Sequence, residues 1–215
     1  MLTLFGNLES GNVHKAQMIL SRRAIPFRRV EVAQVRGEPR RHEFLALNPM
    51  GKVPVLLMDD GDVMTESGAI LFHFAEGTGL WPEGRRAQAE VLRWMFFEQY
   101  SHEAALAVMR YLRNYTDDPA RHEERLTELR PRAHLALDAM QARLGGANWL
   151  VGETPTIADY ALYPYTRMAG EAGVEIEEWP SLLPWLARVE AEPGFLPMYA
   201  DGAIETLSFV EYFGL

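Results

Sequence analysis

The stretch NPMGKVPVL, residues 48–56, places a proline at the start of an apolar segment that otherwise predicts a buried β-strand. Proline has no backbone N–H to donate to a β-ladder, so sheets accept it mainly at strand starts, edges and bulges. A cis bond before Pro54, the form of about 5–6% of X–Pro bonds in folded proteins, would hold the N–H and C=O of Val53 outside the sheet. Those groups would then pair with an extended peptide. An ordinary trans proline at a sheet edge is the alternative.

The composition is that of a globular protein without cysteine. The 215 residues are 48% hydrophobic and 11% aromatic, enough for a full core in one or two domains. The lack of cysteine excludes disulfides, thiolate metal sites and a cysteine nucleophile, and favours a cytoplasmic protein. Apolar runs are too short to span a bilayer, and no secretion signal of the usual pattern opens the sequence.

Charge is unevenly distributed along the chain. Residues 1–78 carry nine Lys or Arg and nine Asp or Glu, so the remaining residues carry the whole formal net charge of −9. An acidic second half argues against a nucleic-acid partner, because such binding depends on basic contacts to phosphate. The six histidines show no HExxH or similar metal-ligand spacing, and P-loop, GxGxxG and nucleophile-elbow motifs are absent. We therefore expect no metal.

The pattern of apolar residues changes near residue 78. Before it, short strand-like stretches alternate with helical ones in the order β-α-β-α-β-β-α, and DDGD at 59–62 predicts a hairpin turn. The first three strands alternate with helices, which permits parallel pairing, and the hairpin adds an antiparallel edge. The predicted elements cover residues 2–5, 12–23, 28–32, 43–48, 53–58, 63–65 and 66–77.

After a linker at residues 79–85, the sequence predicts an all-helical domain over residues 86–215. Its predicted helices cover residues 86–115 and 120–145, begin in TPTIADYALYPY at 154–165, cover 181–192, and end with a short helix after Pro193. In TIAD, Thr156 can cap the helix while Asp159 reaches back, which makes a reciprocal capping box. We interpret this box as a folding feature and not as a catalytic one.

These features together resemble the cytosolic glutathione transferase family. The resemblance rests on a β-α-β-α-β-β-α half with NPMGKVPVL and TESGAI, followed by a helical half with TIADYAL, and covers essentially the whole chain. It implies an α/β thioredoxin-like domain at residues 1–78 and an all-α domain at residues 86–215, usually in a homodimer. It also implies glutathione as the ligand, with the cysteinyl backbone paired to Val53 beside cis-Pro54.

Glu66 and Ser67 precede a predicted helix and are candidates for binding the γ-glutamyl group. A helix N-terminus offers free N–H groups and a partial positive charge, which suit the α-carboxylate. Ser67 adds a hydroxyl donor, and Glu66 can pair with the α-ammonium. The alternative is that Ser67 only caps its own helix. The resemblance favours binding.

Basic residues nearby are candidates for the glycine carboxylate of glutathione. Lys52 precedes Val53 directly, and one of Arg40, Arg41 or His42 is expected to join it. Solvated surface cations are the alternative for each of these side chains.

The catalytic candidates lie in GNLESGNVHKA, residues 6–16. Lowering the pKa of a thiol by roughly two units requires about 2.7 kcal/mol, which one hydrogen bond to the thiolate and a helix dipole can supply. Several classes of the family place the activating residue five before a basic position, as Ser10 stands before Lys15, whereas some bacterial members use an asparagine, here Asn12. We place Ser10 first and Asn12 second. Simple capping of the helix by both is the alternative.

The second substrate is expected in the helical half, where Tyr100, His102, Met109 and Tyr163 are candidates to line a pocket. Aromatic and methionine residues at helical spacing are more often core, which is the alternative.

The resemblance implies an enzyme that binds glutathione and adds its thiolate to a small hydrophobic electrophile, with peroxide reduction as a possible use of the same site. A non-catalytic binding module and a ligand carrier are the other hypotheses. A module would be expected to lose Ser10, Glu66 or Ser67, and this chain keeps all three.

Overall fold

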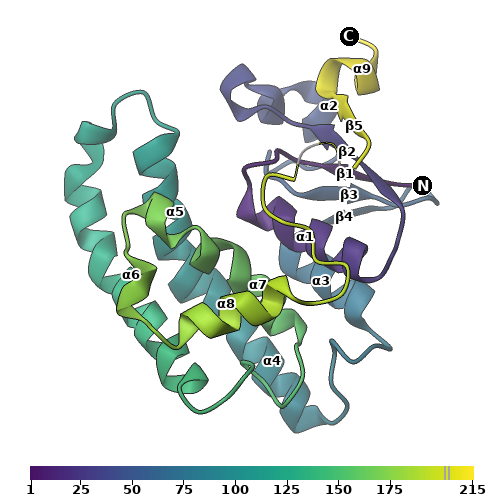
Figure 1. Cartoon of the computed structure of the whole chain (residues 1–215). Helices are drawn as coiled ribbons and strands as arrows, with labels where there is room; N and C mark the ends of the chain where they lie inside the picture. Colours follow the sequence, from purple (N-terminus) through teal and green to yellow (C-terminus); the bar gives the residue numbers. More distant parts are fainter. Residues whose placement is uncertain (201, 203) are drawn as a thin grey trace. The chain divides into compact units, whose positions relative to one another are not determined.

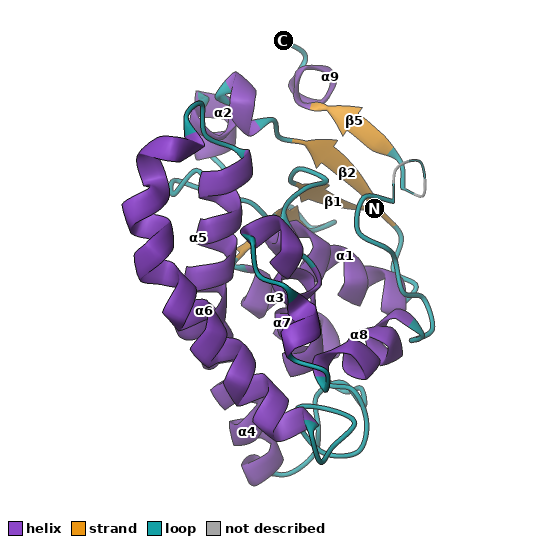
Figure 2. Cartoon of the chain, turned by 60° about the vertical axis from the view of Figure 1, so that its left-hand side comes forward, coloured by secondary structure: helices purple, strands orange, loops and turns teal. Residues whose placement is uncertain are grey.

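The computed structural model covers residues 1–215 and describes all of them except 201 and 203. The chain divides into two compact units, each considered by itself: unit 1 comprises Met1–Phe74 and Glu192–Leu215, and unit 2 comprises Ala75–Ala191. Figure 1 follows the chain by colour from the purple N-terminus to the yellow C-terminal segment. The strands, orange in Figure 2, belong to unit 1, whereas unit 2 is built from helices.

Unit 1 is organised around a five-stranded mixed sheet in the order β4-β3-β1-β2-β5. Its strands are β1 (Leu2–Phe5), β2 (Phe27–Glu31), β3 (Val55–Leu57), β4 (Val63–Thr65) and β5 (Thr206–Ser208). β1 pairs parallel with β2, but β3 pairs antiparallel with both β1 and β4. The predicted order of elements is confirmed, while the parallel pairing holds only for the first two strands. The helix before β3 has four residues and is about 6 Å long, too short to carry the chain back along the sheet.

Helices cover both faces of this sheet. Figure 1 shows α1 (Gly11–Arg22) and α3 (Ser67–Ala75) on one face, and α2 (His42–Leu45) and α9 (Phe209–Phe213) on the other. Short 3-10 turns at Gln34–Arg36 and Glu38–Arg40 lead into α2. The α2 and α9 face is closed by a buried apolar cluster of Phe5, Val30, Val32, Phe44, Val55 and Phe209.

The C-terminal segment differs from its predicted place in the helical domain. Glu192–Leu215 belongs to unit 1, because β5 pairs parallel with β2 and extends the sheet. Phe209 then packs into the core cluster with 1% of its surface exposed. The short helix expected directly after Pro193 is a turn, and the helix follows at Phe209–Phe213. A three-residue strand offers too little alternation of polar and apolar residues to be recognised in the sequence.

Unit 2 confirms the predicted helical character of its region. Its α-helices are α4 (Arg85–Phe97), α5 (Glu103–Asn114), α6 (Glu123–Leu144), α7 (Ile157–Arg167) and α8 (Leu182–Glu190). Shorter 3-10 turns lie at Pro119–His122, Ala169–Ala172 and Ile176–Glu178. The single pattern predicted at residues 86–115 is two helices joined by a π-helical turn at Glu98–His102. Such a turn inserts one residue into the helical ladder, which leaves the apolar periodicity nearly intact.

The predicted capping box of α7 is present. The Thr156 hydroxyl accepts from the Ala158 N–H, and the Asp159 carboxylate accepts from the Thr156 N–H at 2.9 Å. Asp159 also accepts from the Leu150 N–H at 3.0 Å and from the Trp185 indole at 2.9 Å. Burial raises the pKa of the Asp159 carboxyl, and these hydrogen bonds oppose that rise. Asp159 thus links the start of α7 to Leu150 and to Trp185 of α8, which agrees with a role in folding.

His14 joins α1 to the C-terminal segment within unit 1. Its side chain is 1% exposed, and Nε2 donates to the Leu196 carbonyl oxygen at 2.7 Å. Burial lowers the pKa of His14 to about 4, and the hydrogen bond to Leu196 opposes that shift. Nearby, Gly194 has φ +73°, and a Cβ there would lie 2.8 Å from the Ser21 carbonyl oxygen. The segment therefore lies in close contact with α1.

We expect the free energy of unfolding to fall as pH is lowered from 6.5, the ordinary pKa of histidine, to about 4. In that window the unfolded chain protonates His14 while the folded chain keeps it neutral, so protons favour unfolding. The full loss from this residue is about 3 kcal/mol. Urea denaturation of the wild type and His14→Gln across this window measures it. The variant should lose less stability on acidification, and an equal loss in both proteins would contradict the expectation.

Candidate functional site

The N-termini of α1 and α3 meet at one point of unit 1. The Ser67 hydroxyl, on the first residue of α3, donates to Oδ1 of Asn12 in the first turn of α1 at 3.2 Å. Ser67 is 5% exposed, so this contact is largely shielded from water. Two residues that were predicted separately, one for the thiol and one for the γ-glutamyl group, are therefore brought together.

The Val53–Pro54 bond is cis, as the first of the two sequence interpretations requires. Strand β3 begins only at Val55, and the Val53 side chain packs against the core cluster. Across the described part of the chain, no hydrogen bond engages the backbone N–H or C=O of Val53. Both groups are thus available to an extended ligand backbone.

Asn48 braces the loop that leads to Val53. Its Nδ2 donates to the Lys52 carbonyl oxygen at 2.8 Å, and its Oδ1 accepts from the Met50 N–H at 3.1 Å. The side chain is 7% exposed. The sequence analysis did not identify this residue, although an asparagine opening an N-P-x-G turn is a recognisable signal for such bracing. Asn48 fixes the loop from which Lys52 and Val53 project.

Arg40, Arg41 and His42, the three candidates to bind the glycine carboxylate together with Lys52, lie in different environments. A Cβ built on Gly51 would lie 3.1 Å from Nη1 of Arg40, so the Arg40 guanidinium lies against the same loop. Arg41 instead contacts Glu43, with Nε 3.4 Å from the carboxylate, and its guanidinium lies over the Phe209 ring. His42 is exposed at the first residue of α2. Arg40 is therefore the candidate whose position agrees with that of Lys52.

Glu66 adopts a left-handed backbone conformation, with φ +66°. The cost of this conformation for a residue other than glycine is of order 1–3 kcal/mol, and such strain concentrates at functional sites. Its carbonyl accepts from the Ile70 N–H at 3.1 Å, so Glu66 stands immediately before α3 with an exposed side chain. The Ser67 hydroxyl reaches Asn12, which is not the self-capping role considered for it.

Ser10 and Asn12 occupy different environments. Ser10 is the N-cap of α1, where its Oγ accepts from the Val13 N–H at 3.3 Å. A hydroxyl that accepts this bond still has its own proton to donate. Asn12 lies two residues further along, in the first turn of α1, and its side chain contacts Ser67. The capping role considered for Ser10 is thus present, and it is compatible with donation to a ligand.

The four candidates for the second substrate do not gather around one opening. His102 and Met109 are fully buried, and Tyr163 is 2% exposed. His102 Nε2 lies 2.9 Å from the Thr166 hydroxyl, and the Tyr163 hydroxyl donates to Glu190 at 2.9 Å. Burial and Glu190 raise the pKa of Tyr163. Tyr100, in the π-helical turn, is 79% exposed and is the one of the four that faces solvent.

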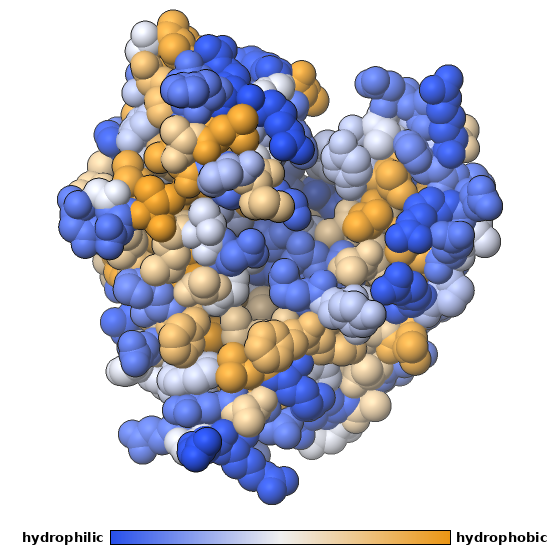
Figure 3. Space-filling view, turned by 180° about the vertical axis from the view of Figure 1, so that it is seen from behind, coloured by the Kyte–Doolittle hydropathy of each residue, from blue (hydrophilic) through white to orange (hydrophobic). Residues whose placement is uncertain are grey.

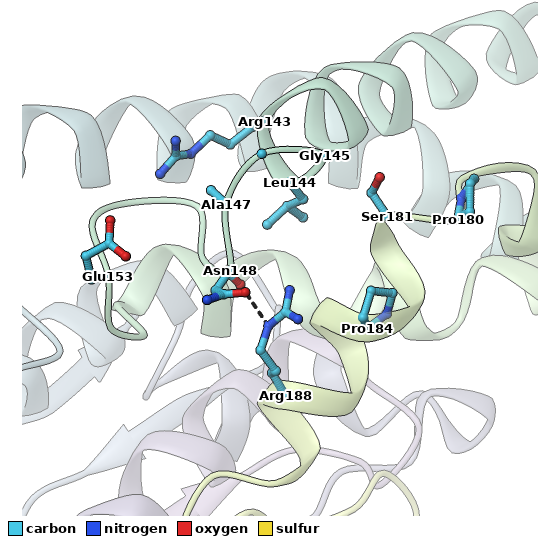
Figure 4. A pocket seen from close by; sticks show the side chains of 11 residues that line it. Arg143, Leu144, Gly145, Ala147, Asn148, Glu153, Pro180, Ser181, Pro184 and Arg188 are labelled. Carbon is cyan, nitrogen blue, oxygen red and sulfur yellow. Dashed lines mark hydrogen bonds between the residues drawn. The ribbon is translucent and has the colours of Figure 1, made fainter.

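Unit 2 contains a polar pocket of about 610 Å³ that the sequence analysis did not identify. Figure 4 shows it between the end of α6, the following loop and the start of α8. Arg143 Nε donates to the Leu150 carbonyl at 2.9 Å, and Arg188 Nε donates to the Asn148 carbonyl at 3.1 Å. The arginines thus hold the loop, and none of the predicted site residues lines this pocket.

The surface carries apolar side chains in small groups. On the face shown in Figure 3 they are interspersed with hydrophilic ones. Exposed examples include Val63 and Phe72 in unit 1, and Leu92 and Phe96 in unit 2. Outside residues 201 and 203, no cluster of three or more His, Asp or Glu side chains could hold a metal ion. None of the described helices has the length and apolar character needed to cross a membrane.

Comparison with known proteins gives two matching family models. The model of the glutathione S-transferase N-terminal domain matches residues 9–76, and that of the C-terminal domain matches residues 98–193. A solved glutathione S-transferase from Xanthobacter autotrophicus Py2 is 46% identical, with a TM-score of 0.88. The match covers 93% of this chain and 97% of that one.

Yeast Ure2 proteins are also similar to this chain. The transcriptional regulator URE2 of Saccharomyces cerevisiae is 27% identical over 90% of this chain and 66% of its own length. The chain thus spans about two thirds of the length of the first such relatives. A solved structure of Ure2p in complex with S-p-nitrobenzylglutathione is 25% identical, with a TM-score of 0.79, over 90% of this chain and 92% of that one.

We expect Glu66→Gly to raise the free energy of unfolding by about 1 kcal/mol, because glycine adopts the left-handed conformation without a Cβ clash. Urea denaturation measures the change. Ala24→Gly is a matched comparison, since Ala24 also has a positive φ, +51°, and lies just after the C-terminal end of α1. Both variants should gain stability, whereas Ala69→Gly, inside α3, should lose about 1 kcal/mol. A loss in Glu66→Gly equal to that in Ala69→Gly would rule out strain at this position.

Proposed function

Because the chain belongs to the glutathione S-transferase family, we propose that it binds glutathione in unit 1 and transfers the thiolate to a small hydrophobic electrophile. The observation that carries this proposal is the convergence of the Asn12–Ser67 hydrogen bond, at 3.2 Å, with a strained Glu66 beside it. Backbone strain of this kind clusters at functional sites, which favours a ligand site beside Glu66. Reduction of a peroxide by glutathione is a second use of the same thiolate.

Each part of glutathione has a proposed partner. The N–H and C=O of Val53, beside cis-Pro54, pair with the cysteinyl backbone as an added strand would. Ser67 and the N-terminus of α3 bind the γ-glutamyl carboxylate, and Glu66 pairs with the α-ammonium. Lys52 and Arg40, which flank the same loop, bind the glycine carboxylate.

Ser10 is the proposed donor to the thiolate. Its Oγ accepts from the Val13 N–H, which polarises the hydroxyl and makes it a better donor. The positive end of α1 adds to the stabilisation of the anion. The thiol proton leaves to solvent, the sulfur forms a bond to the electrophilic carbon, and a leaving group departs with its electron pair or the adduct takes up a proton. Ser10 donates throughout and forms no covalent bond.

Asn12 is the second candidate donor, and its position favours a supporting role. Its Oδ1 accepts from Ser67, so it holds the hydroxyl that is proposed to bind the γ-glutamyl carboxylate. Among the candidates for the electrophile, Tyr100 is the one with an exposed side chain, so it is the proposed contact from unit 2. His102, Met109 and Tyr163 support the interior around their helices.

The proposed setting is a cytoplasmic homodimer acting in detoxification. Exposed apolar side chains are groups that a dimer interface would cover. Val63 and Phe72 are each 41% exposed in unit 1, and Leu92 and Phe96 are 38% and 68% exposed in unit 2. The cytoplasmic assignment rests on the absence of cysteine from the sequence.

A regulatory binding module is the second candidate function. It is favoured by the similarity to a protein named transcriptional regulator URE2. Such a module would bind glutathione without lowering its thiol pKa and without turnover. Saturable conjugation that depends on glutathione separates the enzyme from this module and from a passive ligand carrier.

We expect bound glutathione to have a thiol pKa about two units below the ordinary value of about 8.5. The ultraviolet absorbance of the thiolate, titrated against pH, measures it. Ser10→Ala should restore most of the ordinary pKa, and Ser10→Thr, which keeps the cap and the hydroxyl, should retain the lowered value. Asn12→Ala should weaken glutathione binding with little change in the thiol pKa.

The titration also separates the other assignments. Restoration of the ordinary pKa by Asn12→Ala alone would move the donor role to Asn12. Binding by the wild type at an unshifted pKa would favour the regulatory module. Absence of any binding by the wild type would end the proposal that this chain uses glutathione.

For the dimer, we expect Phe96→Glu to convert the protein to monomers, because a carboxylate cannot be buried there without a partner. Analytical ultracentrifugation at micromolar concentration gives the mass. Leu135→Glu is the control, since Leu135 is also strongly exposed, at 71%, but lies on α6. A monomeric wild type, or dissociation by both variants alike, would contradict the proposed interface.

A further inference from the structure

The C-terminal helix α9 is packed against the segment that carries Arg40. Phe209, its first residue, shares the buried core cluster with Phe44 of α2 and with Phe5 of β1. Tyr212 and Phe213 also contact the Phe5 ring, with ring centroids 5.0 Å and 6.0 Å away. A capping box between Ser208 and Glu211 fixes where α9 begins, directly after β5. The helix is thus anchored on the sheet and on α2.

Arg41 connects α9 to the loop before α2. Its guanidinium carbon lies 5.7 Å from the centre of the Phe209 ring, a cation–π arrangement. Its carbonyl accepts from the N–H groups of Phe44 and Leu45 at 3.1 Å and 2.9 Å, so it starts α2. Its own N–H donates to the Glu38 carbonyl at 3.1 Å and closes the preceding 3-10 turn. Arg41 therefore links the turn Glu38–Arg40 to α2.

The side chains of Arg40 and Arg41 point in different directions. Arg41 has extended backbone angles, φ −71° and ψ 148°, and successive side chains in extended backbone point in different directions. Arg41 lies over the Phe209 ring, whereas Arg40 lies against Gly51 and the loop before Lys52. Glu38 holds the other end of the turn, where its Oε2 accepts from the Ala33 N–H at 2.6 Å.

From these contacts we propose that α9 is a specificity element for the C-terminal end of the ligand. By holding Arg41, Phe209 directs Arg40 toward the carboxylate of the glycine that follows the cysteinyl residue, so that unit 1 distinguishes a γ-glutamyl tripeptide from the dipeptide that lacks glycine. This inference rests on the proposed binding of glutathione in unit 1. Phe209 and Arg41 are positioning residues, and Arg40 is the one that contacts the ligand.

Two ligands separate this role from a general effect on stability. Glutathione ends in the glycine carboxylate, and γ-glutamylcysteine ends one residue earlier in the cysteinyl carboxylate, while both share the γ-glutamyl group and the cysteinyl thiol. Isothermal titration calorimetry gives the dissociation constant of each. One charge-assisted hydrogen bond makes the wild-type preference for glutathione about tenfold or more, and Arg40→Gln should abolish it.

The test variants are Phe209→Leu, which keeps an apolar side chain but removes the ring, and Arg41→Gln, which removes the cation. Arg41 is 44% exposed, so its replacement leaves the core intact if Phe209→Leu fails to fold. Both variants should reduce the preference to about two- to threefold by weakening glutathione, with γ-glutamylcysteine bound as in the wild type. The thiol pKa of bound glutathione should stay lowered in both.

Two controls match these variants. Glu43→Gln removes the carboxylate next to Arg41 and leaves the contact with the Phe209 ring. Val210→Ala changes an exposed residue of the same helix, α9. Both should keep the tenfold preference.

Three results would overturn the inference. These are an equal weakening of both ligands by Phe209→Leu and Arg41→Gln, no change with either variant, and a wild type that binds the two ligands equally. In each case the binding of glutathione itself stands. A wild type that binds neither ligand would instead remove the proposed function, and with it this inference.

Discussion

The hydrogen bond from Ser67 to Asn12 joins two helix N-termini that are far apart in the sequence. Each N-terminus carries unpaired N–H groups and a partial positive charge, and bringing two together creates a region of positive potential without a cationic side chain. The sheet makes this possible, because β1 leads into α1 and the β3–β4 hairpin leads into α3 from neighbouring positions. The proposed thiolate and γ-glutamyl carboxylate are the two negative groups that such a region suits.

Near the Ser67–Asn12 hydrogen bond, two backbone segments have conformations that contribute little to the stability of the fold. Glu66 is held at φ +66°, and the backbone of Val53 is left outside the sheet. Asn48 shows how the rest of the site is kept rigid, since its amide forms two hydrogen bonds to its own loop while it is almost fully buried. Rigid support from a neighbouring residue allows the exposed groups to be held in place before a ligand arrives.

Much of the fold follows from local sequence chemistry. The order of elements in residues 2–75, the cis bond before Pro54 and the capping box of Thr156 and Asp159 each depend on a few neighbouring residues. Two features were not predicted from the sequence, because they depend on contacts between distant residues. They are the antiparallel pairing of β3 with β1 and the pairing of the C-terminal strand β5 with β2. At the candidate site, the sequence offers Arg40, Arg41 and His42 alike, and the different positions of Arg40 and Arg41 depend on contacts with Gly51 and Phe209 that no local pattern contains. Likewise, periodicity could not tell a pocket from an interior at His102, Met109 and Tyr163, because both use the same helix face.

The return of Glu192–Leu215 to unit 1 makes that unit discontinuous in the chain. During synthesis, residues 1–74 emerge first, with the outer edge of β2 unpaired and the ring of Phe5 lacking its contacts with Tyr212 and Phe213. Unpaired strand edges are where chains associate wrongly, and this edge stays open until the whole of unit 2 has been made. Completion of unit 1 is therefore tied to the translation of residues 192–215, so a chain interrupted before them cannot assemble this unit in full.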